Sequence, residues 1–361
     1  MGEPHRVGIV GLGVISAQYL DTLLPREDIQ VVAVADLDFE RASAVADLVS
    51  GAKAVTVAEL IASEDVEIVL NLTTPGAHAE IALGAIAAGK DVYGEKPLAA
   101  AFADATRIVE QADVIGVRLG CAPDTVLGTG VQTARAVIDG GTIGRPLAAS
   151  AVFASPGHEH WHPNPDFYYQ PGGGPLLDMG PYYVAALVHL LGPVTAVVGA
   201  GSRLRGERTI ATGPRAGERV GVEVDSHVTG LLEHEGGVLS TITTTFDSVA
   251  TRAGSIEVHG EFASLSVPDP NQFSGAVGVY RLGASAWEPV EPSAGLINGS
   301  RGVGLLDLLA TPRGHDSRTS GRFALHALEV MTALLESAQT GHRVTLKTTV
   351  SRPPIMPLSS A

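Results

Sequence analysis

Residues 6–16 read RVGIVGLGVIS, and this stretch decides the fold of the first part of the chain. Its first five residues form an apolar run that predicts a buried β-strand, and a glycine turn then opens a helical pattern. Gly11 permits a tight turn, and Gly13 lets the backbone approach a pyrophosphate that the helix N-terminus stabilises. Ser16 stands where the dinucleotide-binding fingerprint has its third glycine. The motif alone is weak, because glycine turns also join ordinary strands and helices.

An acidic residue strengthens the dinucleotide interpretation. Asp36 lies 20 residues beyond Ser16, at the end of the second predicted strand (30–35). A carboxylate there accepts hydrogen bonds from the adenosine ribose and repels a 2′-phosphate, which predicts NAD as the cofactor rather than NADP. Arg41 lies close in sequence and keeps NADP as an alternative. Asp36 could also act only as a turn residue that caps the next helix.

Strand and helix patterns alternate about five times over the first ~120 residues. This order predicts an α/β fold with a doubly wound parallel sheet and helices on both faces. The predicted strands cover residues 6–10, 30–35, 67–73, 91–97 and 114–120, with helices at 40–49 and 78–89 among those between them. We place the first domain at residues 1–122 and the second at residues 123–361.

After residue 122 the pattern changes to an α+β domain with a large, mostly antiparallel open sheet. A long helix is expected at 124–141, with Asp124 capping it, and further helices at 182–191 and 323–341. Strand-like runs separated by short turns fill much of the remainder. Residues 203–220 are predicted to be a loop, and the tail 351–361 is predicted to be extended and poorly ordered.

Composition excludes several classes of protein. The 24 Lys and Arg residues against 39 Asp and Glu residues give a net charge of −15, so we expect neither nucleic acid nor an anionic membrane as a partner. No apolar stretch reaches about 18 residues, which argues against a transmembrane helix. The apolar run at 7–20 contains three glycines and no cleavage site, so it is not interpreted as a signal peptide. Cys121 is the single cysteine, which fits a cytoplasmic protein, and we expect it to be buried rather than nucleophilic.

Two longer motifs carry a resemblance to a known family. Residues 71–99 read NLTTPGAHAEIALGAIAAGKDVYGEKPLA, and residues 172–192 read GGGPLLDMGPYYVAALVHLLG. Together with the glycine turn and Asp36, they resemble the glucose–fructose oxidoreductase / inositol dehydrogenase / rhizopine catabolism (Gfo/Idh/MocA) family over roughly residues 6–345. The resemblance implies a Rossmann domain followed by an open-sheet domain. It also implies NAD(P)-dependent oxidation or reduction of a sugar, polyol or related hydroxy compound.

The resemblance also implies which residues meet the cofactor. These are Gly11, Gly13, Val14, Ile15, Asp36, Thr73, Thr74, Pro75, His78, Glu95 and Lys96. Lys96 ends a strand before a proline, where its ammonium can polarise a substrate hydroxyl and lower the pKa of that hydroxyl. The plainer alternatives are a surface salt bridge at Glu95 and a His78 that starts a helix without touching the cofactor.

The second motif departs from the family pattern D-x-G-x-H-x-x-D. Asp178 matches the first position, but Tyr182 and Ala185 replace the histidine and the second aspartate. Some branches of the family carry tyrosine at this place, so we predict Lys96, Tyr182 and Asp178 as the catalytic residues. A free tyrosine has a pKa of about 10, so this role needs a nearby cation. The alternative for Tyr182 is a ring that packs against the substrate, and His189 is expected to be a core residue.

Residues 157–174, GHEHWHPNPDFYYQPGGG, form a histidine-rich and aromatic segment. Three alternating histidines could gather a metal on a strand, but the prolines favour a loop and no zinc-type spacing is present, so no metal is predicted. Trp161 and His162 are predicted to bind the substrate, with aromatic faces toward a sugar ring and polar groups toward its hydroxyls. The alternative is a structural loop packed on the sheet.

The sequence therefore predicts an NAD(P)-dependent dehydrogenase or reductase acting on CH–OH groups. Two alternatives remain: a non-catalytic dinucleotide or sugar sensor, and a redox-assisted lyase or hydrolase that holds NAD tightly. The exposed face of a large sheet usually needs covering, so a homodimer or homotetramer through the C-terminal sheet is expected.

Overall fold

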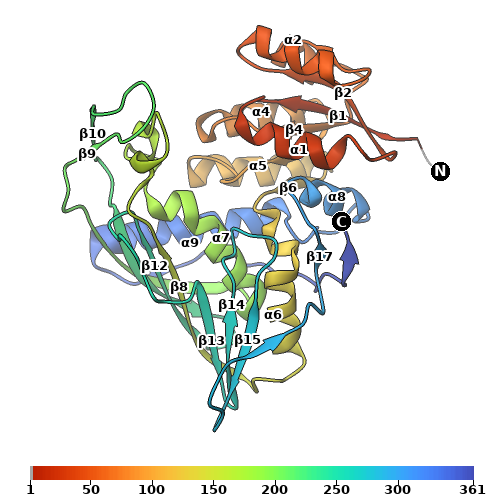
Figure 1. Cartoon of the computed structure of the whole chain (residues 1–361). Coiled ribbons are helices and arrows are strands. Elements are labelled where there is room, and N and C mark those ends of the chain that lie inside the picture. Colours follow the sequence, from red (N-terminus) through yellow and green to blue (C-terminus); the bar gives the residue numbers. More distant parts are fainter. Residues whose placement is uncertain (1–2) are drawn as a thin grey trace. The chain divides into compact units, whose positions relative to one another are not determined.

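The computed structural model describes residues 3–361 and divides the chain into two compact units (Figure 1). The first unit holds the residues up to Asp124 together with Gly299–Leu325 and Ala361. The second holds Thr125–Asn298 and His326–Ser360. The sequence had placed residues 299–325 in the second domain. They belong to the first unit because the apolar side chains of that segment complete the first unit's core.

A six-stranded parallel sheet forms the centre of the first unit, in the order β3-β2-β1-β4-β5-β6. The chain therefore winds outward from β1 in both directions, which confirms the predicted doubly wound sheet. The strands are β1 (His5–Val10), β2 (Ile29–Ala35), β3 (Lys53–Ala54), β4 (Ile68–Asn71), β5 (Asp91–Gly94) and β6 (Leu119–Cys121). The last strand is shorter than the predicted 114–120, because the preceding helix runs to Ile115 and ends at Gly116, whose φ is +81°.

Helices cover this sheet, and their apolar sides supply the core. They are α1 (Val14–Leu23), α2 (Phe39–Leu48), α3 (Val57–Ala62), α4 (Pro75–Ala87), α5 (Phe102–Ile115) and α8 (Val303–Ala310). Helix α8 was missed by the sequence analysis. Its Leu305 and Leu308 are almost completely buried in one cluster with Val7 and Ile9 of β1. Burial of such side chains stabilises a domain by about 1.5–3 kcal/mol each, which ties this late segment to the first unit.

The second unit contains a nine-stranded sheet in the order β16-β15-β14-β13-β7-β12-β11-β8-β18. All neighbouring strands are antiparallel except β7 and β12, which run parallel, so the predicted mostly antiparallel sheet is confirmed. The strands are β7 (Pro146–Ala154), β8 (Val194–Ser202), β11 (His227–His234), β12 (Leu239–Thr245), β13 (Ile256–Gly260), β14 (Ala263–Val267), β15 (Val277–Arg281), β16 (Glu288–Val290) and β18 (Val344–Thr345).

The register of this sheet separates two faces. One cross-strand row is buried throughout: Val197, Leu232, Ser240, Ala149, Val258, Leu265 and Val279. The adjacent row is partly or fully exposed: Val198, Leu231, Thr241, Ser150, Glu257, Ser266 and Gly278. Helices α6 (Thr129–Asp139), α7 (Pro175–Leu191) and α9 (Gly321–Thr340) pack on the sheet. Leu334 of α9 lies close against the backbone of Gly199 and Gly230, on the buried side.

Two predicted segments differ from the structure. The long helix expected at 124–141 is a 3-10 turn, Asp124–Leu127, followed by α6, because the chain bends at Gly128. A Cβ there would lie 2.0 Å from the carbonyl oxygen of Phe273, so only glycine fits. The predicted loop 203–220 contains a small hairpin of β9 (Glu207–Thr209) and β10 (Arg219–Gly221).

The C-terminal tail is extended, as predicted, but it is held in place rather than loose. The Met356 N–H donates to Gln132 Oε1 at 2.8 Å, and the Met356 carbonyl accepts from the Gly295 N–H. Strand β19 (Ser359–Ser360) then pairs in parallel with β17 (Leu296–Ile297). Tertiary hydrogen bonds of this kind cannot be predicted from the local amino-acid composition.

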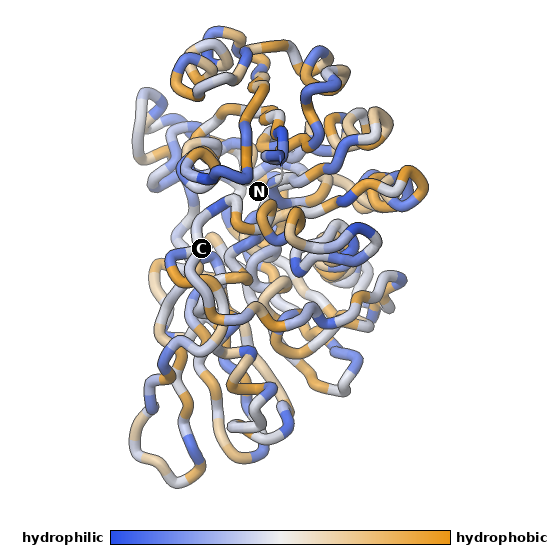
Figure 2. Tube along the Cα trace, turned by 90° about the vertical axis from the view of Figure 1, so that its right-hand side faces the viewer, coloured by the Kyte–Doolittle hydropathy of each residue, from blue (hydrophilic) through white to orange (hydrophobic). Residues whose placement is uncertain are grey.

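Apolar and polar stretches are interspersed along the trace (Figure 2). Among the helices of residues 3–361, none is both long enough and apolar enough to cross a membrane.

Candidate functional site

The glycine turn lies between β1 and α1, where the sequence predicted it. Gly11 has a φ of +91°, and a Cβ on it would lie 2.7 Å from the backbone of Leu72 and Thr73. The turn after β1 therefore packs directly on the turn after β4, and this contact requires glycine. Ser16, in the place of the third glycine, is buried, and its hydroxyl donates to the Gly13 carbonyl at 2.7 Å.

The N-terminus of α1 is open. Gly13 is its N-cap, no side chain caps the helix, and a Cβ at Gly13 would meet no atom within 4 Å. Val14, the first helical residue, is 95% exposed. Unsatisfied N–H groups at a helix start favour an anion, so uncapped donors beside open space fit the pyrophosphate of a dinucleotide.

Asp36 lies directly beside this turn. Its Oδ2 accepts the Leu12 N–H at 2.7 Å, and its Oδ1 accepts the Asp38 N–H at 2.9 Å. Partial burial opposes ionisation, but these backbone donors and the Arg41 guanidinium outweigh it and lower the pKa of Asp36. The Arg41 guanidinium pairs with Asp36 and also with Asp38. An ionised Asp36 with Asp38 nearby fits a ribose hydroxyl better than a 2′-phosphate.

Asp38, not Asp36, caps α2, since its side chain accepts the Arg41 N–H. This removes the alternative in which Asp36 is only a helix cap. The side chain of Asp36 is instead committed to the glycine turn itself, through Leu12.

His78 joins two turns at the carboxyl edge of the parallel sheet. Its Nδ1 lies 2.7 Å from the Pro97 carbonyl oxygen, and its Nε2 lies 2.9 Å from that of Thr73. The buried ring therefore lies between two carbonyl oxygens, and a neutral imidazole donates its single N–H to one of them. The Thr73 hydroxyl in turn donates to Asn71 Oδ1 at 2.7 Å. This geometry favours a part for His78 in holding the turns, and any direct contact with a cofactor stays a prediction.

Glu95 ties the turn after β5 to α1. Its Oε1 accepts the Tyr19 hydroxyl at 2.8 Å, and its Oε2 accepts the Lys96 N–H at 3.1 Å. Burial, and next the charge of Glu95, raise the pKa of Tyr19 well above its usual range, so this hydroxyl stays protonated and keeps donating. Lys96 is half-buried. The alternative of a surface salt bridge at Glu95 is not observed; Glu95 instead links the Lys96 turn to α1.

Cys121 of β6 and the adjacent Arg118 have different surroundings. Cys121 is buried, as predicted, and its thiol lies 3.5 Å from the Glu95 carbonyl oxygen. Burial, and next Glu95, raise the pKa of this thiol, which keeps it an unreactive SH group. Arg118 precedes β6, at the amino edge of the sheet, and its guanidinium binds the buried carboxylate of Asp91 at 2.8 Å.

In the second unit, α7 carries the other predicted catalytic residues. Asp178 lies in the first turn of the helix, and Tyr182 follows one turn later. The helix begins after Gly172 and Gly174, which both have a φ near +90°, a backbone conformation that glycine adopts without strain. Tyr182 and His189 are buried, which agrees with the predicted core position of His189.

Asp178 has a partner that the sequence analysis missed. The Nε2 of His158, in the aromatic loop, lies 2.7 Å from Asp178 Oδ2. His158 had been considered only as part of a three-histidine metal site. Among residues 3–361 no group of three or more His, Cys, Asp or Glu side chains is arranged to hold a metal ion. The sequence signal was the histidine itself, but its partner is 20 residues away and only the fold joins them.

The loop around His158 presents aromatic rings to its surroundings. Trp161 and Phe167 are 58% and 53% exposed. His162 is half-buried, its ring lies 5.3 Å from that of Trp161, and its Nδ1 accepts the Asn164 N–H. Exposed aromatic faces of this kind suit the predicted wall for a sugar ring, and that role stays a prediction.

A buried ionic network, also missed by the sequence analysis, anchors this loop. The Tyr169 hydroxyl donates to Glu159, and Arg208 of β9 binds Glu159 at 3.2 Å and Asp247 at 2.6 Å. The Asp247 carboxylate also accepts the Ser226 hydroxyl at 2.5 Å. Breaking a buried pair of this kind costs about 3–5 kcal/mol, so the loop has one firmly held conformation.

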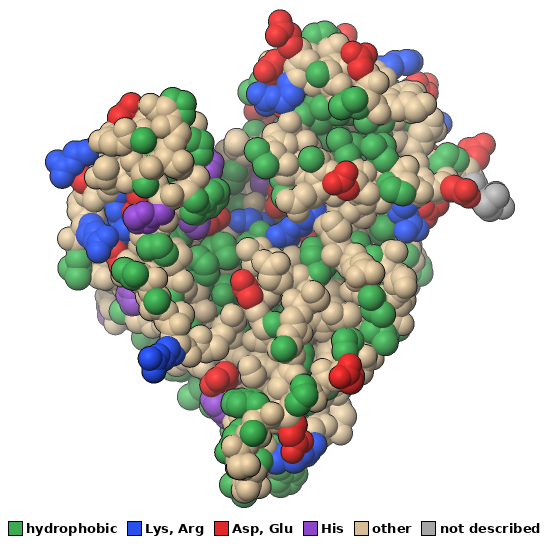
Figure 3. Space-filling model, viewed as in Figure 1, with side chains coloured by type: hydrophobic (Ala, Val, Ile, Leu, Met, Phe, Trp, Pro, Cys, Tyr) green, Lys and Arg blue, Asp and Glu red, His purple; other side chains and the backbone are tan. Residues whose placement is uncertain are grey.

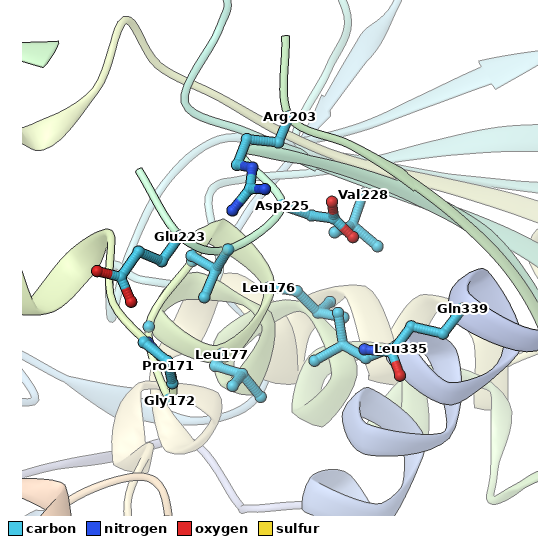
Figure 4. A pocket seen from close by; sticks show the side chains of 13 residues that line it. Pro171, Gly172, Leu176, Leu177, Arg203, Glu223, Asp225, Val228, Leu335 and Gln339 are labelled. Carbon is cyan, nitrogen blue, oxygen red and sulfur yellow. The ribbon is translucent and has the colours of Figure 1, made fainter. Parts of the chain in front are cut away.

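A cavity of about 600 Å³ in the second unit does not include these residues (Figure 4). Its floor is aliphatic, with Leu176, Leu177 and Leu335, and Arg203 and Asp225 lie at its rim. Asp178 and His158 do not line this cavity. On the face shown in Figure 3, acidic and basic side chains are interspersed without a continuous basic patch.

Comparison with known proteins matches both units. A sequence model described as the oxidoreductase family with an NAD-binding Rossmann fold (GFO/IDH/MocA) covers residues 5–122. A second, the GFO/IDH/MocA C-terminal domain, covers residues 131–266.

Two relatives and one solved structure illustrate the similarity. The 1,5-anhydro-D-fructose reductase of Ensifer adhaerens is 30% identical over 72% of this chain and 75% of its own length. Inositol 2-dehydrogenase 3 of Saccharopolyspora erythraea is 37% identical over 42% of this chain, and the match spans under half of that relative, 45%. An NAD-binding oxidoreductase from Klebsiella pneumoniae shares the fold with a TM-score of 0.79, at 22% identity over 95% of this chain and 99% of its own.

Proposed function

Because this chain belongs to the GFO/IDH/MocA family of oxidoreductases, whose N-terminal domain is an NAD-binding Rossmann fold, we propose that it oxidises or reduces a sugar or polyol. The reaction transfers a hydride between a nicotinamide dinucleotide and a CH–OH carbon. The names of the relatives, an inositol dehydrogenase and an anhydrofructose reductase, support this substrate class.

One observation carries the proposal. The turn that bears Lys96 is bonded through Glu95 to Tyr19 of α1, and through the Pro97 carbonyl to His78 of α4. Both links are partly buried and short, at 2.8 and 2.7 Å. The Lys96 turn and the open N-terminus of α1 therefore belong to one rigid frame at the carboxyl edge of the sheet, where ligands bind in doubly wound folds.

The roles of the side chains follow from their chemistry. The dinucleotide, when bound, supplies the hydride acceptor or donor. The Lys96 ammonium polarises the substrate oxygen and stabilises negative charge that develops on it. Asp178 orients the substrate by accepting hydrogen bonds from its hydroxyls, and Tyr182 accepts or returns the hydroxyl proton.

Replacement of the lysine tests the proposal. Lys96→Met keeps the apolar stem and removes the charge, so turnover should fall by at least ~10²-fold while NAD affinity changes little. The substrates are a panel of inositols, aldoses and anhydro sugars, and reduced nicotinamide is followed by its absorbance. Lys53→Met, on exposed Lys53 of β3, is the matched control and should keep full activity. Binding of NAD and sugar without any turnover would instead identify a sensor.

We also propose that copies of the chain associate through the nine-stranded sheet. The row of residues that includes Val198, Leu231 and Thr241 is left partly exposed on the face opposite the buried row. Val198 and Leu239 are 40% and 46% exposed, so this face carries partly exposed aliphatic side chains. A second copy of the same face would cover them through a two-fold axis.

A further inference from the structure

We propose that His158 is a positioning residue that orients the Asp178 carboxylate, and that Trp161 selects the tautomer of His158 needed for this task. The inference rests on the proposed function only for its effect on turnover. The hydrogen bonds that carry it belong to the second unit alone.

The hydrogen bonds around the ring define where its proton lies. The indole nitrogen of Trp161 can only donate, and it lies 3.2 Å from His158 Nδ1. His158 Nδ1 must therefore accept, which leaves the ring proton on Nε2 in the neutral imidazole. Nε2 lies 2.7 Å from Asp178 Oδ2, an acceptor. The chain of donors thus runs from Trp161 through His158 to Asp178, and both ring nitrogens of His158 have a partner.

Packing keeps the ring in this orientation. His158 is 7% exposed, and rings of Tyr168, Phe246 and Trp161 surround it at 4.3, 4.5 and 5.0 Å between centroids. A flipped ring would place carbon atoms against the carboxylate and the indole N–H. In a site with little water, leaving either group unpaired costs about 1–3 kcal/mol.

The backbone of His158 is held as firmly as its ring. The His158 N–H donates to the Tyr169 hydroxyl at 3.2 Å, and that hydroxyl donates to Glu159. Gly157, with a φ of +113°, brings the chain past these groups, where a Cβ would lie 2.2 Å from the Glu159 carboxylate. The Glu159–Arg208 network therefore acts on Asp178 through His158.

The histidine beside Asp178 comes from the loop and not from α7. Helix α7 carries tyrosine where the family pattern has histidine, so it supplies no histidine beside Asp178 at that position. A histidine from the loop supplies the N–H donor to the carboxylate instead. The indole N–H of Trp161 is donated to His158. The exposed ring of Trp161 can therefore contact a substrate only through its aromatic face.

Two variants at position 158 separate hydrogen bonding from packing. His158→Gln places an amide N–H at about the reach of Nε2 and should keep kcat within about tenfold of the wild type. His158→Phe keeps an aromatic ring in the cage but donates nothing to Asp178, so kcat should fall about 10²-fold through misplacement of the carboxylate. Thermal unfolding of both variants shows whether each is folded. A purely structural ring would give the reverse order, with Phe more active than Gln, and would overturn the proposal.

Nitrogen NMR tests the tautomer without any need for activity. In ¹⁵N-histidine-labelled protein, the signals of His158 are identified by their loss in His158→Gln. We expect Nε2 protonated and Nδ1 unprotonated, and both tautomers populated in Trp161→Phe. A wild-type ring protonated at Nδ1 would overturn the proposal. If no sugar or polyol is turned over by the wild type, the proposed function fails while this measurement still decides the tautomer.

Discussion

At the residue scale, the candidate site is built from side chains whose hydrogen bonds are set by neighbouring turns. Asp36 binds the glycine turn through Leu12, and Glu95 binds α1 through Tyr19. Each carboxylate is held in one orientation by the groups that donate hydrogen bonds to it. Predictions about single residues therefore concern charge and hydrogen bonding more than packing.

The cofactor preference is the first such prediction. The ionised Asp36 should disfavour the 2′-phosphate of NADP by about 1 kcal/mol or more, so NAD should bind at least about fivefold more tightly. Asp36→Ala removes this repulsion and frees Arg41 from one of its two carboxylates. The difference in affinity between NAD and NADP should therefore become smaller. Dissociation constants for both cofactors decide the matter, with exposed Asp47→Ala on α2 as the control. Equal or tighter NADP binding by the wild type contradicts it.

The second prediction concerns Tyr182. If its hydroxyl carries the proton, Tyr182→Phe should lower kcat by ~10²-fold or more and leave substrate affinity nearly unchanged. If the ring only packs against the substrate, Phe should be almost silent and Tyr182→Ala should mainly raise KM. Steady-state kinetics of both variants distinguish the two roles.

At the element scale, α8 shows how a distant segment is attached to the first unit. Asp124 was expected to cap the helix that follows it. Its Oδ2 instead accepts the N–H groups of Gly302 and Gly304, at 2.7 and 3.2 Å, and so caps α8. Arg301 lies 3.5 Å from its other oxygen. The prediction that Asp124 caps the helix following it was therefore wrong, because the N–H groups that it accepts begin 178 residues further along the chain.

This cap should give the protein a characteristic pH dependence. Burial raises the pKa of Asp124 to about 6, although Arg301 opposes the shift. The folded state then binds more protons than the unfolded state between about pH 4 and pH 6, so this group's contribution to stability falls as pH rises through that window. The stability contribution that Asp124 loses is at most about 3 kcal/mol, and it is fully lost above about pH 6. In Asp124→Asn, the difference in the free energy of unfolding between pH 4 and pH 6.5 should be smaller than in the wild type, as measured by urea unfolding.

A matched control keeps that measurement specific. Asp104→Asn, at an exposed first-turn position of α5, should leave the pH dependence of unfolding as it is in the wild type. Identical pH slopes for Asp124→Asn and the wild type would show that the buried carboxylate is not the source.

At the scale of the whole molecule, the exposed face of the nine-stranded sheet is the feature with a testable consequence. Thr241 lies near the middle of the exposed row, between Leu231 and Ser150. In a two-fold dimer, Thr241→Arg would place an arginine of one subunit near the same arginine of the other subunit. Repulsion between these like charges and the loss of packing should separate the subunits. Light scattering after gel filtration should show a dimer or tetramer for the wild type and a smaller species for the variant. A monomeric wild type contradicts the proposal.

By itself, the sequence determined the doubly wound sheet and the glycine turn with Asp36. It also placed Lys96 after a strand and Asp178 near the start of a helix. These features are local, because a strand period, a turn glycine or a helix start is written in adjacent residues. Only the tertiary structure decided the partners: His158 for Asp178, Tyr19 for Glu95, and α8 for Asp124. Such pairs join residues 20 to 178 positions apart, and a hydrogen bond depends on distance in space. The local sequence pattern carries no information about which distant residue will be the hydrogen-bond partner of a given side chain.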